Sequence, residues 1–195
     1  MISKNINNKT DKELVLLTLD EPAVFGVIME RYEKRMLIYI KRISSVTNEE
    51  AEDILQDSFL KAYQNLNNFD QELTFSSWMY RIVHNETISN WRKNKSRPQG
   101  NAVYVDDEFL ERIVDSQDIQ GDVDKDILKK SVENIMIDMD DKYREILILK
   151  YIEDKSYEEI SDILKKPAGT IATHISRAKK QFRDLCMSSD INLLM

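Results

Sequence analysis

The chain has 195 residues, of which 42% are hydrophobic and 32% charged, with a net charge of −7 and only four glycines. This length suits one or two small domains, and so few glycines leave little material for strand turns, which favours an all-helical fold. Because the single cysteine, Cys186, excludes an internal disulfide, and neither a secretory segment nor an apolar run of ~20 residues is present, we expect a cytoplasmic protein without membrane insertion.

Two capping boxes predict the first helices. Thr10 precedes Glu13, and Thr47 precedes Glu50, by the three residues that let side chain and backbone satisfy each other at a helix start. The first box opens a short helix, and Pro22 begins a long one. We expect the apolar positions of the long helix to lie in the core: Phe25, Ile28, Met29, Tyr32, Met36 and Tyr39.

The helix that follows Thr47 has an acidic outer strip. Its sequence AEDILQDSFLKAYQNL buries six positions at helical spacing: Ala51, Ile54, Leu55, Ser58, Phe59 and Ala62. This leaves Glu52, Asp53, Gln56 and Asp57 together on the outside. Carboxylates in the first turns of a helix also suit its macrodipole, so periodicity alone assigns no partner to the strip.

A further helix, from about Thr74 to Lys95, mixes aromatic and basic residues. Trp78 and Trp91 are 13 positions apart, which turns them roughly 140° from each other on an ideal helix. Either this helix is buried on two sides, or one tryptophan is presented to an unstacked base while basic residues hold the phosphates.

The acidity of the chain lies in one segment. Residues 99–126 carry nine carboxylates and two bases, which accounts for the whole net charge. The segment has no sustained helical period and separates two periodic regions, so we interpret it as a linker. A passive solvated tether remains an alternative to a functional role.

The segment SYEEISDILKKPAGTIATHISRAKKQFRDL predicts a helix-turn-helix. Ser156 and Glu159 form a third capping box, and Pro167 ends the first helix in a short turn. The first helix has an apolar face of Tyr157, Ile160, Ile163 and Leu164. The second helix has an apolar stripe of Ile171, Ile175, Ala178, Phe182 and Leu185.

The outer side of that second helix is polar. It carries Thr173, Ser176, Arg177 and Lys180, which are hydroxyls that can approach base edges and bases that can reach phosphates. A merely solvated face is the alternative. The turn spacing and the cap agree with a recognition helix in the major groove.

Two long motifs carry a family resemblance. The run AEDILQDSFLKAYQNLNNFDQELTFSSWMYRIVHN, followed after the acidic spacer by DDKYREILILKYIEDKSYEEISDILKKPAGTIATHISRAKKQF, resembles a bacterial sigma-70-family factor of the extracytoplasmic function (ECF) type. The resemblance spans nearly the whole chain. It implies two helical domains, at residues 10–97 and 128–187, joined by a flexible acidic linker at residues 98–127.

The resemblance implies roles for residues of the first domain. Asp53, Gln56 and Asp57 correspond to the surface that docks on the beta-prime clamp of core RNA polymerase, which also contacts the factor through its beta subunit. The loop from Phe69 to Phe75 corresponds to the element that captures a flipped base of the minus-10 promoter element. The minus-10 candidates are Phe69, Phe75, Arg81, Asn85, Arg92 and Lys93. Trp78 corresponds to the family's core.

The second helix of the helix-turn-helix resembles the family's minus-35 reader. The candidates are Thr170, Ala172, Thr173, His174, Ser176, Arg177 and Lys180. The chain departs from the family pattern at Lys165, where glycine is common, and at Lys166, Ala172 and His174. Two cations have thus moved into the turn, where they can still contact phosphate. We expect His174 to be a neutral polar residue, since Cys186 and His84 offer it no metal-ligand spacing.

The function expected is binding without catalysis and without a cofactor, with weak promoter affinity for the free chain and strong affinity in the holoenzyme. An anti-sigma protein is a further partner that such factors often have. One alternative is a stand-alone regulator that binds two operator half-sites as a dimer. The other is a metal-dependent nuclease that uses Glu52, Asp53 and Asp57.

Overall fold

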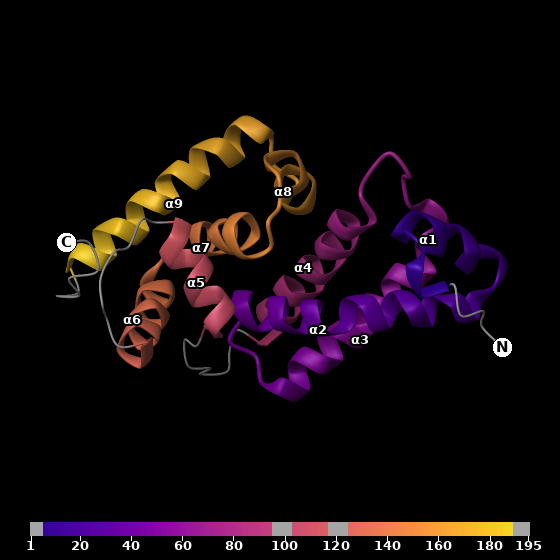
Figure 1. Cartoon of the computed structure of the whole chain (residues 1–195), viewed down its shortest axis with the longest axis horizontal. Coiled ribbons are helices and arrows are strands. Elements are labelled where there is room, and N and C mark those ends of the chain that lie inside the picture. The colour runs from indigo at the N-terminus through magenta and orange to yellow at the C-terminus, as the bar shows by residue number, and fades with distance from the viewer. Residues whose placement is uncertain (1–5, 95–102, 117–124, 189–195) are drawn as a thin grey trace. The chain divides into compact units, whose positions relative to one another are not determined.

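The computed structural model describes residues 6–94, 103–116 and 125–188, and these ranges contain helices and loops but no strand (Figure 1). The predicted all-helical fold is confirmed. The chain divides into two compact units. The first comprises residues 1–41 and 46–98, and the second comprises residues 42–45 and 99–195.

Three principal helices follow a short first helix in the first unit. The elements are η1 (Ile6–Asn8), α1 (Asp11–Asp20), η2 (Pro22–Val24), α2 (Phe25–Ile43), α3 (Asn48–Gln64), η3 (Leu66–Asn68) and α4 (Phe75–Asn94). Thr10 and Thr47 each accept a hydrogen bond from the backbone of a glutamate three residues on, whose side chain bonds back to the cap. Both capping boxes are therefore confirmed.

Aromatic rings fill the core of the first unit. Phe75 lies with its ring centroid 5.6 Å from that of Tyr32 on α2 and 5.5 Å from that of Phe69, in T-shaped contacts. Trp78 packs against both phenylalanines and is buried, as the resemblance implied. Met29 was predicted in the core, and this is wrong: it is 39% exposed, because the partners of α2 cover a narrower face than its apolar stripe.

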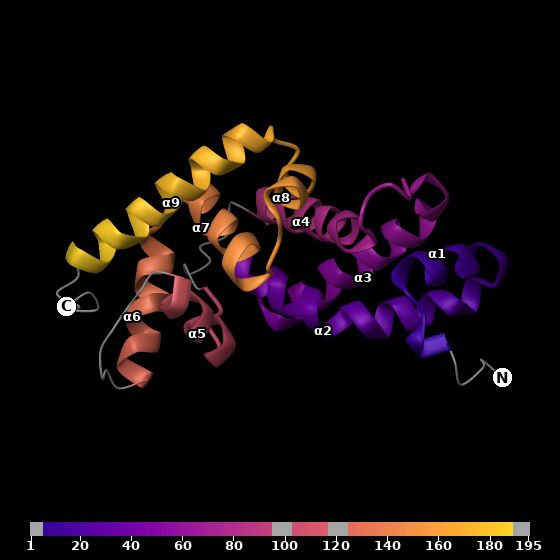
Figure 2. The same cartoon turned by 45° about the horizontal axis from the view of Figure 1, so that its top comes forward.

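The second unit contains the remaining helices. They are α5 (Asp107–Ser116), α6 (Lys125–Asp138), α7 (Asp141–Leu147), η4 (Ile148–Ile152, a π-helical turn), α8 (Tyr157–Leu164) and α9 (Ala168–Ser188). Figure 2 shows α8 and α9 meeting at a short turn. The long α9 packs on both α7 and α8. The buried positions of α9 are Ile171, Ile175, Ala178, Phe182 and Cys186, with Leu185 only half-buried.

Part of the predicted linker is a packed helix. The interpretation that this segment has no helix is wrong for α5, whose Phe109, Leu110 and Ile113 are buried at i, i+1 and i+4. Asp106 starts the helix by accepting a hydrogen bond from the Phe109 amide at 2.8 Å. Runs of carboxylates hid this short apolar stripe. Of the other linker residues, 103–106 lead into α5 and 125–127 begin α6, whereas 98–102 and 117–124 lie outside the described residues.

The helix-turn-helix forms as predicted. Ser156 accepts a hydrogen bond from the Glu159 amide at 3.1 Å, so the third capping box is also confirmed. Tyr157 was placed on the apolar face, and this is wrong: it is 37% exposed beside the ammonium of Lys150, 5.3 Å from its ring centroid. Lys165 ends α8 in the left-handed conformation, with φ 53° and ψ 46°.

Replacing Lys165 by glycine should stabilise the second unit. A side chain in the left-handed region costs about 1–2 kcal/mol, and glycine avoids that cost, so we expect Lys165→Gly to raise the free energy of unfolding by about 0.5–1 kcal/mol in urea titrations. The lost ion pair with Asp162 is exposed on the lysine side and contributes little.

Lys166→Gly is the matched control for this change. The φ of Lys166 is not positive, since Asp154 and Lys165 are the only non-glycine residues with positive φ in the described part of the chain. Glycine there adds freedom to the unfolded chain and should lower stability. Equal losses from both substitutions would contradict the strain at Lys165.

Candidate functional site

The acidic strip is solvent-facing on α3. Asp53, Gln56 and Asp57 are exposed, while Ala51, Ile54, Leu55 and Ser58 are buried on the other side of the helix, as the periodicity predicted. The buried Ser58 hydroxyl donates to the Ile54 carbonyl at 2.6 Å, so its polar group is satisfied. The packing of α3 therefore fixes the direction in which the strip points.

An apolar residue that the sequence reading missed lies on this strip. Leu60 is 55% exposed and follows Asp53, Gln56 and Asp57 at the i, i+3, i+4, i+7 spacing of one helix face. Extending the same periodicity by one turn would have found it. Because this leucine lies beside carboxylates, the surface has both a charged and an apolar component.

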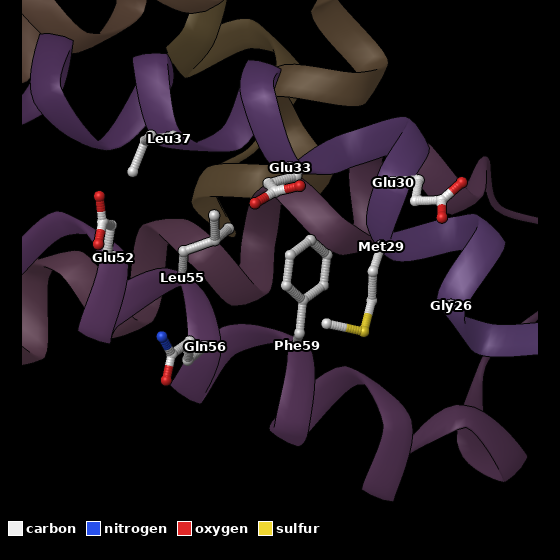
Figure 3. Close-up of a pocket in the computed structure, with 9 residues that line it drawn as sticks. All are labelled: Gly26, Met29, Glu30, Glu33, Leu37, Glu52, Leu55, Gln56 and Phe59. Carbon is white, nitrogen blue, oxygen red and sulfur yellow. The ribbon is translucent and has the colours of Figure 1, made fainter. Parts of the chain in front are cut away.

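A groove between α2 and α3 adjoins the strip. Figure 3 shows side chains from both helices facing each other across it. Its volume is about 370 Å³, and Leu37, Leu55, Phe59 and Met29 form its apolar lining. Gln56 belongs both to this lining and to the acidic strip. The two surfaces are therefore continuous.

Carboxylates edge this groove. Glu30 and Glu33 come from α2 and Glu52 from α3, all three are exposed, and no basic residue is among the described residues that line it. An apolar floor with an acidic rim suits a partner that has apolar side chains flanked by cations. The α2 side of the groove also follows helical spacing, so it could have been found from the sequence. Its residues are Gly26, Met29, Glu30, Glu33 and Leu37.

The predicted minus-10 residues on α4 gather on one face. Arg81, Asn85 and Arg92 fall within about 40° of one another around the helix axis, and Lys93 lies beside Arg92. Asn85, Arg92 and Lys93 are exposed, whereas Arg81 is half-buried. An amide and two cations along one helix face, with Lys93 about 100° round the axis from Arg92, can contact both base edges and phosphates.

Phe69 and Phe75 do not join that face. Both rings are buried in the aromatic core, where Phe69 also lies 5.2 Å from Trp78 between ring centroids. The expectation that Phe69, together with Asn85, supplies a pocket and a polar group for a flipped base stays a prediction. The burial of Phe69 and Phe75 anchors the two ends of the loop at 70–74, which carries the exposed Asp70, Gln71 and Glu72.

The outer face of α9 is as predicted. Thr173, Ser176, Arg177 and Lys180 are exposed on the side opposite the buried stripe. Thr170 and His174 flank this face on one edge and Ala172 on the other, from their angles at about 100° per residue. The Thr173 hydroxyl donates to the Gly169 carbonyl at 3.0 Å, which leaves its oxygen able to accept from a base.

His174 contacts α7, which sequence reading did not foresee. Its ring meets Tyr143 edge to face, with centroids 5.8 Å apart, and Lys142 stands 4.7 Å above the same tyrosine ring. The pKa of His174 is lowered, first by burial and then by Lys166, Arg177 and Lys142. The imidazole is therefore neutral at pH 7, as expected.

Within the described residues, no group of three or more His, Cys, Asp or Glu side chains is arranged to hold a metal ion. Glu52, Asp53 and Asp57, which the nuclease alternative would use, are thus not such a group. Separately, none of the helices in the described part of the chain is both long and apolar enough to cross a membrane.

Comparison with known proteins assigns the family. Residues 28–97 match the model described as Sigma-70 region 2, and residues 129–182 match the one described as Sigma-70, region 4. The chain is 38% identical to the ECF RNA polymerase sigma factor SigW of Bacillus subtilis (strain 168), over 83% of this chain and 90% of that protein. The chain belongs to the ECF sigma factors. As a sigma factor, it directs transcription initiation at promoters.

Other sigma factors support this assignment. The RNA polymerase sigma-H factor of Pseudomonas aeruginosa is 28% identical over 90% of this chain and 93% of that protein. Among solved structures, CnrH in complex with the cytosolic domain of CnrY covers 92% of this chain and 99% of that one, at 20% identity and a TM-score of 0.65. The sigma factor RpoE of Bartonella quintana, in complex with the anti-sigma factor NepR, covers 85% of this chain and 98% of that one, at 21% identity and a TM-score of 0.62. These likenesses confirm the fold.

Proposed function

We propose that this sigma factor docks on core RNA polymerase through α3 and the α2–α3 groove, contacts an opened minus-10 strand along α4, and reads the minus-35 duplex with α9. It acts in the cytoplasm and contributes binding rather than catalysis. The observation that carries the proposal is the exposed leucine of α3, Leu60, which lies with Asp53, Gln56 and Asp57 on a surface continuous with an apolar groove.

The docking surface suits the clamp of the beta-prime subunit. Exposed carboxylates accelerate encounter with a basic partner, while desolvation of Leu60 and the groove supplies affinity once contact is made. The macrodipole accounts for acids in the first turn of α3, but Asp57 and Leu60 lie beyond it. A partner surface explains the strip, whereas the dipole explains Glu49 and Glu50, which precede it.

The polar face of α4 makes the contact with the minus-10 element. Asn85 can donate and accept at a base edge, and Arg81, Arg92 and Lys93 can hold the phosphates of the single strand. Phe69 and Phe75 act by anchoring the loop between η3 and α4. We propose that base capture uses polar groups of this loop and of α4.

The minus-35 contact falls to the outer face of α9. Arg177 can read a guanine or hold a phosphate, and Thr173 and Ser176 are short enough to approach base edges. Ala172 can contact only apolar atoms such as a thymine methyl group. The basic residues of the turn, Lys165 and Lys166, supply phosphate contacts in place of the cations that the helix lacks.

An anti-sigma protein is a second partner that we propose. Both solved structures described above are complexes with a second protein, and in the structure of the sigma factor RpoE that protein is named an anti-sigma factor. A regulator that covers the α2–α3 groove would exclude polymerase from the same surface. Competition between such a protein and core enzyme for the full chain would support this regulation, and simultaneous binding would contradict it.

Reconstitution with core polymerase tests the proposed function. Run-off transcription on a random promoter library should return initiation that depends on this chain, from templates sharing two elements about two helical turns apart. The stand-alone regulator predicts instead that the chain binds duplex DNA equally well with and without polymerase. No selective initiation would overturn the proposal.

Removing the charge of the docking strip should weaken polymerase binding. We expect the double variant Asp53→Asn, Asp57→Asn, and separately Leu60→Ala, to bind core enzyme about tenfold less tightly in a fluorescence titration, because the first loses steering and the second loses apolar burial. Asp20→Asn is the control, since it removes an exposed carboxylate at the end of α1. If Asp20→Asn weakened binding as much as the double variant, the strip would have no specific role.

The exposed carboxylates of α5 should affect initiation rather than promoter binding. Asp106 is a helix cap and is excluded, which leaves Asp107, Glu108 and Glu111 to occupy basic surface of the polymerase nucleic-acid channel. Their replacement by Asn, Gln and Gln should leave promoter affinity within about twofold and change the yield of short abortive transcripts. With Asp138→Asn as the control, unchanged transcript yield would identify α5 as a passive connection.

A further inference from the structure

Three cations from three parts of the second unit act electrostatically on His174. Lys142 comes from α7, Lys166 from the turn, and Arg177 from the next turn of α9. Tyr143 contacts both Lys142 and the His174 ring. The cluster therefore joins α9 to an element outside the helix-turn-helix pair.

The nearby carboxylates are paired with basic residues. Asp140, the N-cap residue of α7, pairs at 3.4 Å on the exposed surface with Lys142 of the cluster itself, and Asp141 of α7 pairs with Arg144. On α8, Asp162 pairs with Lys165 at 2.8 Å. Among the described residues, the charged groups that shift His174 are all cations, and all three disfavour its protonated form. The cluster has excess positive charge at one edge of the α9 face.

The His174 ring itself is incompletely satisfied. Its Nδ1 atom is buried without a hydrogen-bond partner in the described structure. A buried polar atom without a partner is costly, and a protonated imidazole without a counter-charge is more so. An anion placed among the three cations would remove the second cost, because its charge favours imidazolium.

The DNA phosphodiester is the anion that this edge of α9 would meet. Phosphate contacts provide most of the affinity and fix the register of a recognition helix, while base contacts specify sequence. We propose that Lys142, Lys166 and Arg177 hold one phosphate of the minus-35 duplex, and that His174 takes up a proton when this phosphate binds. This inference rests on the minus-35 role proposed above and adds Lys142 and the proton to it.

The direction of the pH effect follows from linkage. In the free chain the pKa of His174 lies below its ordinary value of 6.5. A bound phosphate offsets the three cations, so the pKa is higher in the complex than in the free chain. Because the complex then binds more protons, duplex affinity rises as pH falls through the interval between the two pKa values. Well above that interval, the imidazole is neutral in both states and has no pH effect.

Duplex affinity at two pH values tests the proton. The probe is a fluorescein-labelled duplex with the minus-35 element that the promoter library returns, titrated with the full chain at low salt. From about pH 8 to about pH 6, the wild type should gain threefold to tenfold in affinity, and His174→Gln should gain none. His84→Gln, which removes the other histidine of the chain, should retain the gain.

The outcomes separate the two proposals. An equal gain for wild type and His174→Gln would overturn the proton uptake and leave the minus-35 role intact. No binding of the duplex at either pH, by the chain assembled with core polymerase, would overturn both. Because the ratio between two pH values is compared within each variant, a uniform loss of affinity from the substitution does not affect the result.

Ring resonances test the phosphate source. With only two histidines, the His174 signal can be followed through a pH titration by NMR, alone, with the duplex, and with inorganic phosphate at the same concentration. The duplex should raise the His174 midpoint, and inorganic phosphate should leave it unchanged. An equal rise with inorganic phosphate would indicate a general anion site and overturn the assignment to DNA.

Lys142 has a test of its own. Lys142→Gln should weaken duplex binding about threefold and reduce the slope of log affinity against log salt by about one, the signature of one lost phosphate contact. Lys130→Gln, an exposed lysine on α6, is the control and should change neither. If Lys142→Gln and Lys130→Gln had identical effects, Lys142 would contribute only general positive charge and would not contact a specific phosphate.

Discussion

Burial of one apolar face on each helix is the constraint on which every functional surface of this sigma factor depends. In α9, the stripe from Ile171 to Cys186 fixes the helix rotation, so Thr173 and Arg177 face outward. A shift of one residue would rotate the helix by about 100° and replace that face. Core packing therefore sets the register of the DNA-reading side chains.

Between α2 and α3, burial of the apolar faces is incomplete. Phe59 and Leu55 are buried, yet they still form part of the groove lining, while Met29 and Leu60 remain exposed nearby. Apolar surface beside a row of carboxylates is costly for a free monomer and useful to a protein that works in a complex. The aromatic core around Phe75 has no such exposure, which gives the docking helices a firm support.

Local signals in the sequence predicted most of the fold. The three capping boxes at Thr10, Thr47 and Ser156 form because their hydrogen bonds involve residues three positions apart, so neighbouring helices are not needed to specify them. Periodicity likewise placed the strip of α3 and the outer face of α9. Predictions of burial that depended on neighbouring helices were wrong in two places. Met29 and Tyr157 are exposed because no other helix covers them, which the pattern of a single helix cannot reveal.

The missed parts of the site have the same origin. Helix α5 has only a short apolar stripe, and its stability comes from burial of Phe109 and Ile113 against the rest of its unit. Lys142 precedes His174 by 32 positions, and only the packing of α7 on α9 brings the two together. Sequence spacing shows which residues share a helix face, but contacts between helices need the fold.

The turn between α8 and α9 determines where the displaced charge acts. With Lys165 in the left-handed conformation, the Lys166 amide donates to the Ser161 carbonyl at 3.2 Å, and the Ser161 hydroxyl donates to the Lys166 carbonyl at 2.6 Å. These two bonds fix the backbone of Lys166, whose ammonium acts on His174. The departure from the family pattern at the turn and the departure at His174 are thus electrostatically coupled. The outer face of α9 lacks cations at Ala172 and His174, and the lysines of the turn supply positive charge at the edge of that face instead. There they can bind phosphate but cannot read a base.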